Sequence, residues 1–211
     1  MNLAAVFWSL IFGFVCGSVP FGYLTGLLNR IDIRKTGSGN IGFTNVQRVL
    51  GLGWGMLVLL LDIAKGIVPV IFAPAVHLIP PLVGLGAVLG HIFTPWLGFS
   101  GGKGVATTMG IAALLCPRSF LLALTVFLLV ILISGFVSLS SISFALTLPV
   151  LTARFYYQNR LLLLFTIAVS LVIIIRHYEN VRRLIQGREP RFELWLRIFR
   201  KQTGKMSAGG Q

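Results

Sequence analysis

The chain has 211 residues, of which 56% are hydrophobic and only 11% are charged, and its mean hydropathy is +0.91. These values exclude a water-soluble globular domain and indicate an integral membrane protein. The formal net charge of +13 does not indicate nucleic-acid binding here, because cationic flanks of membrane spans set topology and contact anionic lipids. An anionic substrate is also compatible with this charge.

Seven apolar runs follow one another along the chain, and we expect each to form a helix. They cover Leu3–Leu28, Leu52–His77, Leu82–Leu97, Val105–Cys116, Ser119–Ser134, Val137–Ala153 and Leu161–Ile175. The runs fill most of the sequence, so we expect residues 1–190 to form a single membrane domain. No Lys or Arg precedes the first run, which differs in this from a signal peptide and is expected to be retained as a span.

The number of spans depends on the segment Val105–Ser134, which Pro117 can divide into two helices. Charge favours this division. With seven spans, the loop Arg30–Gly51, the loop around Lys103 and the tail from Arg176 all lie on one side of the membrane. We therefore predict an all-α protein with seven transmembrane helices, the N-terminus outside and the C-terminus in the cytoplasm. The glycine-rich and polar segments then gather at the cytoplasmic face, which favours a site there over a transport path.

The first of these segments, GSGNIGFTNVQR, covers Gly37–Arg48. On composition alone a flexible loop is the simpler interpretation. Three glycines permit positive φ and the close approach of a ligand, and successive N–H groups in such a turn form a concave anion site. These glycines are Gly37, Gly39 and Gly42. Ser38, Asn45 and Arg48 can add side-chain donors, and an arginine can bind a phosphate through two hydrogen bonds.

The second segment places Gly101, Gly102, Lys103 and Gly104 directly before a helix that we expect to begin near Val105. A glycine-rich entry to a helix N-terminus, with one lysine, is a phosphate-binding arrangement. It is not a nucleotide-binding P-loop, because Leu97 replaces the first glycine and Gly104 replaces the Ser or Thr of that motif. His91, at the end of an apolar run, is equally compatible with a substrate role and with a hydrogen bond to the backbone at a helix end.

The third segment, HYENVRRLIQGRE, places His177, Asn180 and Arg183 at helical spacing, so that they can share one face. Three serines lie between two spans at the same side of the membrane. They are Ser138, Ser140 and Ser141, and helix capping is their default interpretation, with donation to a ligand as the alternative.

Other residues are assigned structural roles. Asp62 and Lys65 are three apart on one helix and are expected to pair within the membrane, with support of the site as their second role. The cysteines Cys16 and Cys116 lie in apolar runs, which favours packing over a disulfide or metal site. Four glycines have the spacing of close helix packing. They are Gly13, Gly17, Gly22 and Gly26.

The tail, residues 191–211, is cationic and amphipathic, and we expect a helix that lies on an anionic membrane surface. Its apolar stripe consists of Phe192, Trp195, Leu196 and Phe199.

The whole chain has only five acidic residues. It therefore contains no carboxylate cluster for Mg²⁺ or Zn²⁺ and no carboxylate pair for acid–base catalysis. We expect neither a metal nor another cofactor. Lys, Arg, Asn, Ser and backbone donors suit a substrate that carries phosphate and an activated leaving group, which the protein positions while it stabilises charge.

The segments GSGNIGFTNVQRVLG, GHIFTPWLGFSGGKGVAT and HYENVRRLIQGRE closely resemble, in this order, the three cytoplasmic motifs of the bacterial acyl-phosphate:glycerol-3-phosphate acyltransferases. GSVPFGYL and DIAKG in the first two spans also resemble that family. The resemblance implies an inner-membrane enzyme, active at the cytoplasmic face, that transfers a fatty acyl group from acyl phosphate to the 1-hydroxyl of glycerol 3-phosphate. The products would be lysophosphatidic acid and inorganic phosphate, at the first acylation step of phospholipid synthesis. Phe43 departs from the family, which usually has a small residue there, and the tail after Phe192 is longer than expected.

The resemblance also implies a role for each motif residue. Glycerol 3-phosphate would be held by Ser38, Arg48, Lys103, Ser141, His177 and Asn180, among which Ser38, Lys103 and His177 are the catalytic candidates. Acyl phosphate would approach the residues Gly37, Gly39, Asn40, Gly42, Asn45, Gly101, Gly102 and Gly104. We expect a monomer whose partners are these two substrates and membrane lipids, with no nucleic acid, and a substrate phosphate oxygen as the proton acceptor.

Two alternative functions belong to other classes of membrane protein. A seven-helix transporter or channel for a small anion would need polar positions in the outer halves of several spans, and these are mostly Leu, Ile, Val and Phe. A phospholipid head-group transferase would usually carry Asp-rich metal motifs, which the sequence lacks.

Overall fold

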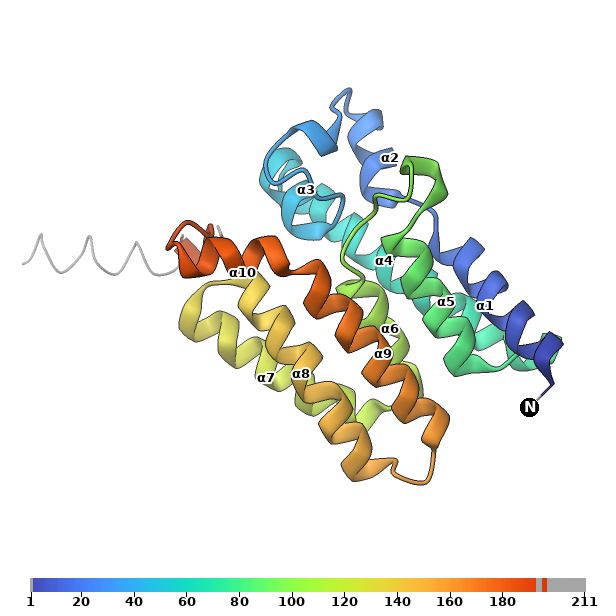
Figure 1. Cartoon of the computed structure of the whole chain (residues 1–211). Coiled ribbons are helices and arrows are strands. Elements are labelled where there is room, and N and C mark those ends of the chain that lie inside the picture. Colours follow the sequence, from blue (N-terminus) through green and yellow to red (C-terminus); the bar gives the residue numbers. More distant parts are fainter. Residues whose placement is uncertain (1, 193–194, 197–211) are drawn as a thin grey trace, which may run out of the picture.

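The computed structural model describes residues 2–192, 195 and 196, and within that range its regular elements are helices (Figure 1). The α-helices are α1 (Leu3–Gly17), α2 (Phe21–Leu28), α3 (Phe43–Leu50), α4 (Leu52–Phe72), α5 (Pro80–Ile92), α6 (Val105–Leu115), α7 (Pro117–Ser134), α8 (Val137–Phe155), α9 (Arg160–Arg176) and α10 (Tyr178–Ile185). Short 3₁₀ turns lie at Ile33–Lys35, Pro74–Val76 and Pro95–Leu97. The short helices α3 and α10 lie at the same end of the bundle, and the N-terminus lies at the other end (Figure 1).

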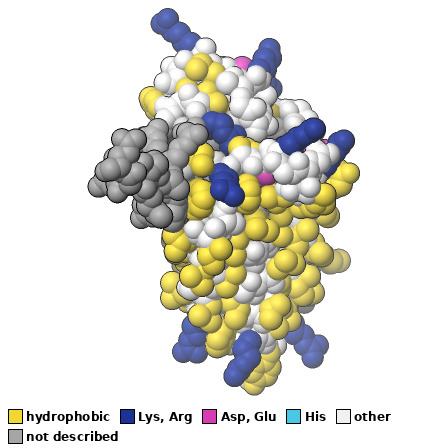
Figure 2. All heavy atoms as spheres, turned by 90° about the vertical axis from the view of Figure 1, so that its left-hand side faces the viewer, with side chains coloured by type: hydrophobic (Ala, Val, Ile, Leu, Met, Phe, Trp, Pro, Cys, Tyr) yellow, Lys and Arg dark blue, Asp and Glu magenta, His cyan; other side chains and the backbone are white. Residues whose placement is uncertain are grey.

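Several helices have the length and composition of membrane spans. In the described part of the chain five segments qualify: Leu3–Leu28, Leu52–Phe72, Pro80–Leu97, Pro117–Ser134 and Val137–Phe155. Helices α9 and α10, bent by 51° relative to each other, qualify as a sixth only when taken together. On the face that Figure 2 shows, a band of hydrophobic side chains lies between groups of Lys and Arg at the two ends of the bundle. The all-helical membrane architecture is confirmed, whereas the count of seven spans and their orientation remain predictions.

Two prolines divide apolar runs. Helix α6 ends at Leu115 and α7 begins at Pro117, so the predicted division of Val105–Ser134 is confirmed. The first run was expected to be continuous, but α1 ends at Gly17 and α2 begins at Phe21. The physical reason is Pro20, which lacks the N–H that a continuous helix needs.

Glycines allow α1 to pack directly against α5. A Cβ atom at Gly17 would lie 2.0 Å from the carbonyl oxygen of Ala87, and one at Gly13 would lie 1.9 Å from that of Val83. Helix α5 contributes Gly90 in return, where a Cβ would lie 2.1 Å from the carbonyl oxygen of Phe14. The predicted packing role of these α1 glycines is therefore confirmed.

Gly22 performs the same task for the first motif. A Cβ at Gly22 would lie 1.7 Å from the carbonyl oxygen of Ile41, within the loop before α3. At Gly26 it would lie 2.7 Å from the carbonyl oxygen of Ile31. Helix α2 thus holds the loop that carries Ser38 and Asn40 in place. Cys16 and Cys116 are both free thiols, as expected for packing residues.

We predict that Gly17→Ala destabilises the protein by about 1–3 kcal/mol, because the new methyl group meets backbone that side-chain rotation cannot relieve. Gly53→Ala is the matched control, since a Cβ at Gly53 in α4 would have no neighbour within 4 Å. The control should leave stability unchanged or raise it by up to about 1 kcal/mol, because alanine favours the helix. Thermal unfolding midpoints in one detergent measure both, and equal midpoints would contradict the packing account.

Candidate active site

A cavity of about 590 Å³ lies at the end of the bundle that carries α3 and α10, and all three polar motifs line it. Eleven of the predicted site residues lie in its wall. They are Gly37, Ser38, Asn40, Gly42, Asn45, Arg48, Lys103, Gly104, Ser141, His177 and Asn180. The predicted gathering of polar segments is therefore borne out in space. Gly39, Gly101 and Gly102 are not among the lining residues.

Asn45 in α3 gives the first motif its shape. Its buried side chain accepts a hydrogen bond from the Ser38 N–H (2.8 Å) and donates to the carbonyl oxygens of Ile33 (3.1 Å) and Thr36 (3.0 Å). Gly37 has a φ of +64°, and a Cβ there would lie 2.2 Å from Asn45 Oδ1. Asn45 was expected to donate to a ligand, but its amide donors are used by the loop itself.

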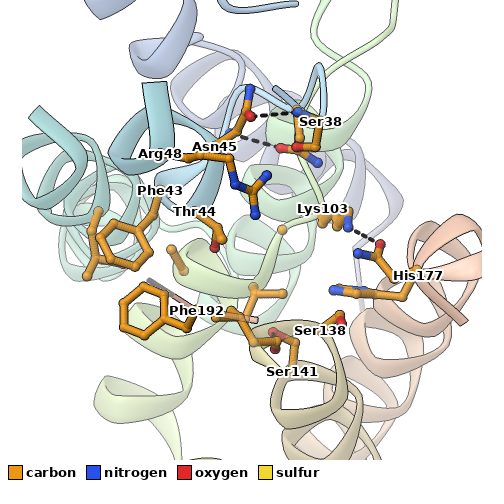
Figure 3. A pocket seen from close by; sticks show the side chains of 18 of the residues that line it. Ser38, Phe43, Thr44, Asn45, Arg48, Lys103, Ser138, Ser141, His177 and Phe192 are labelled. Carbon is orange, nitrogen blue, oxygen red and sulfur yellow. Dashed lines mark hydrogen bonds between the residues drawn. The ribbon is translucent and has the colours of Figure 1, made fainter. Parts of the chain in front are cut away.

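The glycines of the first motif differ in conformation. Gly39 also has a positive φ, of +71°, as expected. Gly42 does not, because its φ is −83° and it precedes the first residue of α3. The Gly42 N–H donates to Asn40 Oδ1 at 2.8 Å, so Gly42 does not use the positive φ that glycine permits. Arg48 projects from α3 toward the space between Thr44 and Lys103 (Figure 3).

Gly101 and Gly102 fit the second motif against α5. Their N–H groups donate to the carbonyl oxygens of Ile92 (2.9 Å) and His91 (3.1 Å). A Cβ at Gly102 would lie 2.0 Å from His91 Nε2. The Gly101 carbonyl in turn accepts from Arg176 Nη2 at 3.1 Å. These two amides were expected to face a phosphate, but in this structure they hold the loop.

The N-terminus of α6 opens on the cavity. Gly104 precedes α6 with a φ of +83°, a backbone conformation that favours glycine. Gly104, Val105 and Ala106 all line the cavity. The first N–H groups of a helix have no partner within the helix and carry a partial positive charge. The chemistry of this end of α6 suits an anionic oxygen, and its role as a phosphate site stays a prediction.

A chain of hydrogen bonds holds Lys103 in the cavity wall. Lys103 Nζ donates to Asn180 Oδ1, and Asn180 Nδ2 donates to Glu189 Oε1 at 2.6 Å. Arg183 Nε then donates to Glu189 Oε2 at 2.7 Å. Asn180 therefore positions Lys103 through protein contacts on both of its amide atoms.

The charges of this chain of hydrogen bonds follow from their surroundings. Burial lowers the pKa of Lys103 to about 8, and Glu189 opposes this shift. Burial by itself raises the pKa of Glu189, but the hydrogen bonds from Asn180 and Arg183 outweigh it and lower that pKa overall. At neutral pH the carboxylate is therefore ionised, and the lysine is mostly charged but close to its titration range.

His177 lies beyond the apolar run Leu161–Ile175, at the bend between α9 and α10. Its Nδ1 is 2.8 Å from the carbonyl oxygen of Ile173. Burial and the nearby Lys103 charge lower the pKa of His177 to about 4, so the ring is neutral at pH 7. Because a carbonyl oxygen only accepts, we assign the proton to Nδ1, which leaves Nε2 as an acceptor.

The serines of α8 do not cap that helix. The residue that precedes α8 is Phe136, and it makes no side-chain cap. Ser140 Oγ donates to the Phe136 carbonyl (2.9 Å) and Ser141 Oγ to the Val137 carbonyl (2.8 Å). Capping was the default expectation and is wrong, because all three serines lie inside the first turns of α8. Ser138 and Ser141 line the cavity instead (Figure 3).

The pair predicted in the second span is present, with Lys65 Nζ 2.8 Å from Asp62 Oδ1. His91 Nδ1 lies 3.5 Å from the same oxygen, so the imidazole ring of α5 faces a carboxylate of the preceding helix, α4. Asp62 and His91 both line the cavity. Sequence reasoning gave Asp62 a pairing role first and support of the site second, but no spacing rule relates it to His91.

Glu189, Phe43 and Phe192 also line the cavity without having been assigned to it. Glu189 could have been suspected from the sequence, because it is one of two acidic residues in the third motif. The contact between Phe43 and Phe192 could not, because it joins α3 to the C-terminal segment and leaves no pattern in the local sequence.

The amino-acid sequence is similar to those of known proteins. A family model described as glycerol-3-phosphate acyltransferase matches residues 7–187. The glycerol-3-phosphate acyltransferase of Geobacter sulfurreducens is 43% identical over 183 residues, which cover 85% of this chain and 94% of the relative. That of Aquifex aeolicus is 39% identical over 187 residues, which cover 87% of this chain and 97% of the relative.

Two solved structures are also similar. The integral membrane glycerol 3-phosphate acyltransferase PlsY, in its glycerol 3-phosphate form, superposes with a TM-score of 0.81 at 37% identity, over 89% of this chain and 95% of that chain. A lysophosphatidic acid form of PlsY gives a TM-score of 0.78 at 36% identity, over 88% and 94% of the two chains.

We predict that Asn45→Asp destabilises the protein by about 2 kcal/mol or more, because a carboxylate keeps the bond from Ser38 but faces the carbonyl oxygens of Ile33 and Thr36. The matched control is Asn29→Asp. Asn29 is partly buried and its amide makes a single bond, to the Thr25 carbonyl at 2.8 Å. The free energy of unfolding of this control should fall by about 1 kcal/mol or less. Unfolding midpoints in detergent test this, and similar losses in both variants would contradict the clamp role of Asn45.

Proposed function

The chain belongs to the glycerol-3-phosphate acyltransferase family and is an acyltransferase, and we propose that it transfers a fatty acyl group from acyl phosphate to the 1-hydroxyl of glycerol 3-phosphate. The products are lysophosphatidic acid and inorganic phosphate. One observation carries the proposal: a single cavity brings together Arg48, Lys103, His177 and the N-terminus of α6 next to apolar side chains. Such a cavity suits two phosphate groups and one hydrocarbon chain.

The two phosphates are divided between two sets of donors. Ser38, Arg48 and Lys103 hold the phosphate of glycerol 3-phosphate, since the two cations reach the cavity from separate elements. The phosphate of the acyl donor lies at the α6 N-terminus, beside Gly104 and Val105. Lys103 directly precedes Gly104 and also lines the cavity, so it can in addition neutralise charge that develops on the leaving phosphate.

The reaction is a direct acyl transfer. The glycerol hydroxyl oxygen attacks the acyl carbonyl carbon, and the bond from that carbon to the phosphate oxygen then breaks. His177 Nε2 accepts a hydrogen bond from the hydroxyl and orients it, but a pKa of about 4 makes this ring a weak base. A phosphate oxygen of the substrates therefore takes the proton. Neither a covalent enzyme intermediate nor a metal is needed for this sequence of bonds.

The acyl chain occupies the apolar part of the cavity. Leu59, Met109, Phe127 and Val137 line it from α4, α6, α7 and α8. Chains of this kind enter from the bilayer, which surrounds those helices.

The proposed orientation places this cavity at the cytoplasmic face of the bacterial inner membrane, with seven spans and the N-terminus outside. Two observations support it. The N-terminus lies at the end of the bundle opposite α3 and α10 (Figure 1). The loops at the cavity end carry most of the Lys and Arg residues, as the positive-inside rule requires.

We predict that purified protein in lipid, supplied with glycerol 3-phosphate and palmitoyl phosphate, releases phosphate and forms lysophosphatidic acid. Palmitoyl-CoA in a parallel reaction should give no product. Lys103→Ala should lower kcat/KM by at least about 100-fold, because it removes the charge beside the developing oxyanion. Lys35→Ala, at an exposed lysine outside the cavity, should retain full activity. No product from either donor with folded protein would contradict the proposal.

We predict that His177→Ala keeps a measurable kcat while its KM for glycerol 3-phosphate rises at least about 10-fold, because the ring orients the hydroxyl and does not take the proton. His77→Asn, in the exposed connection between α4 and α5, is the control and should match the wild type. Steady-state kinetics with varied glycerol 3-phosphate separate the two parameters. Complete loss of kcat with unchanged substrate binding would identify His177 as the general base.

A further inference from the structure

Two phenylalanines from distant parts of the chain meet in the cavity wall. The rings of Phe43 and Phe192 have centroids 6.1 Å apart, at an interplanar angle of 52°. Both line the cavity, on the side opposite Lys103 and His177 (Figure 3). The pair therefore lies on the far side of the cavity from the proposed reaction centre.

The C-terminal segment that carries Phe192 is anchored to the turn between α7 and α8. The Phe192 N–H donates to the Gly135 carbonyl at 2.8 Å, and Trp195 Nε1 donates to the Leu132 carbonyl at 2.8 Å. The Arg191 guanidinium lies 4.8 Å from the Trp195 ring centre. Gly135 has a φ of +74°, and a Cβ there would lie 2.8 Å from the Trp195 ring. These contacts fix the position of the Phe192 ring.

This segment was expected to lie on the membrane surface, and that expectation stays a prediction. Phe192 and Trp195 also contact the protein, and Phe192 extends the cavity wall beyond residue 190. Of the other two residues of the predicted stripe, Leu196 donates its N–H to the Phe192 carbonyl at 3.1 Å, and Phe199 lies outside the described residues. The family match ends at residue 187, so Phe192 lies past the matched region.

Phe43 is held just as firmly from the other side. It is the first residue of α3, two positions before Asn45, whose three hydrogen bonds fix the loop. An aromatic pair between two fixed backbones has little freedom to separate, and each ring buries a large apolar area. The pair therefore limits the width of the cavity on this side.

We propose that the Phe43–Phe192 pair sets the cross-section of the acyl chain that the enzyme accepts, by narrowing the path along which the chain leaves the reaction centre. This inference rests on the proposed acyltransfer from acyl phosphate. Straight saturated chains pass the rings, and chains with methyl branches pass them less readily. Apolar walls discriminate a single methyl or methylene group by about 10- to 200-fold, so the effect is measurable as a ratio of kcat/KM values.

The test compares palmitoyl phosphate with a methyl-branched acyl phosphate of the same chain length. The wild type should prefer the straight chain by at least about 10-fold. Phe43→Ala and Phe192→Ala should each reduce that preference about 10-fold, and Phe192→Leu should reduce it less. Because the rings act as one constriction, the double variant should add little to either single variant. The KM for glycerol 3-phosphate should stay within about 2-fold in every variant.

Phe155→Ala is the matched control, because Phe155 ends α8 at the other end of that helix from Ser138 and Ser141 and does not line the cavity. Its preference should equal that of the wild type. An active wild type without preference, or a preference that neither Phe43→Ala nor Phe192→Ala changes, would overturn the inference and leave the acyltransferase proposal intact. An inactive wild type with both acyl phosphates would instead contradict the proposed function.

Discussion

The ion pair between Lys65 and Asp62 in α4 links the first membrane helices to the candidate active site. Within the apolar bundle the Lys65 ammonium donates to the Val19 carbonyl at the break between α1 and α2, 2.8 Å away, and also contacts Asp62. Removal of one partner from a buried pair typically costs about 3–5 kcal/mol, because a charge remains without a counterion. The pair therefore fixes α4 against the proline break in the first run.

From Asp62 the connection continues to the second motif. His91 faces Asp62, and the Gly101–Gly102 backbone fits against His91. Lys103 directly follows Gly102 in the chain. Its position therefore depends on the buried Asp62 carboxylate of α4. On its other side Lys103 is held by Asn180 and Glu189. In the proposed reaction, such fixed surroundings favour the stabilisation of developing charge by Lys103, because little reorganisation is then required.

Much of this could be predicted from local sequence. Apolar runs indicated the helices, Pro117 indicated the division between α6 and α7, and three polar motifs indicated one shared site. Glycine residues, by contrast, serve different structural purposes that their identity alone does not distinguish. Gly37 and Gly104 have positive φ, Gly17 allows two helices to touch, and Gly102 makes room for a histidine ring. Composition cannot separate these tasks, because each is defined by what lies beside the glycine in space.

The sequence by itself determined the membrane class, the helical elements, the polar motifs that line one cavity and the pairing of Asp62 with Lys65, since all of these follow from hydropathy and from spacing along one helix. Only the tertiary structure decided that Asn45 closes its own loop, that Glu189 holds Arg183 and Asn180, and that Phe192 meets Phe43. These contacts join residues of separate elements. Their geometry depends on how the helices pack, and that packing is a property of the whole chain.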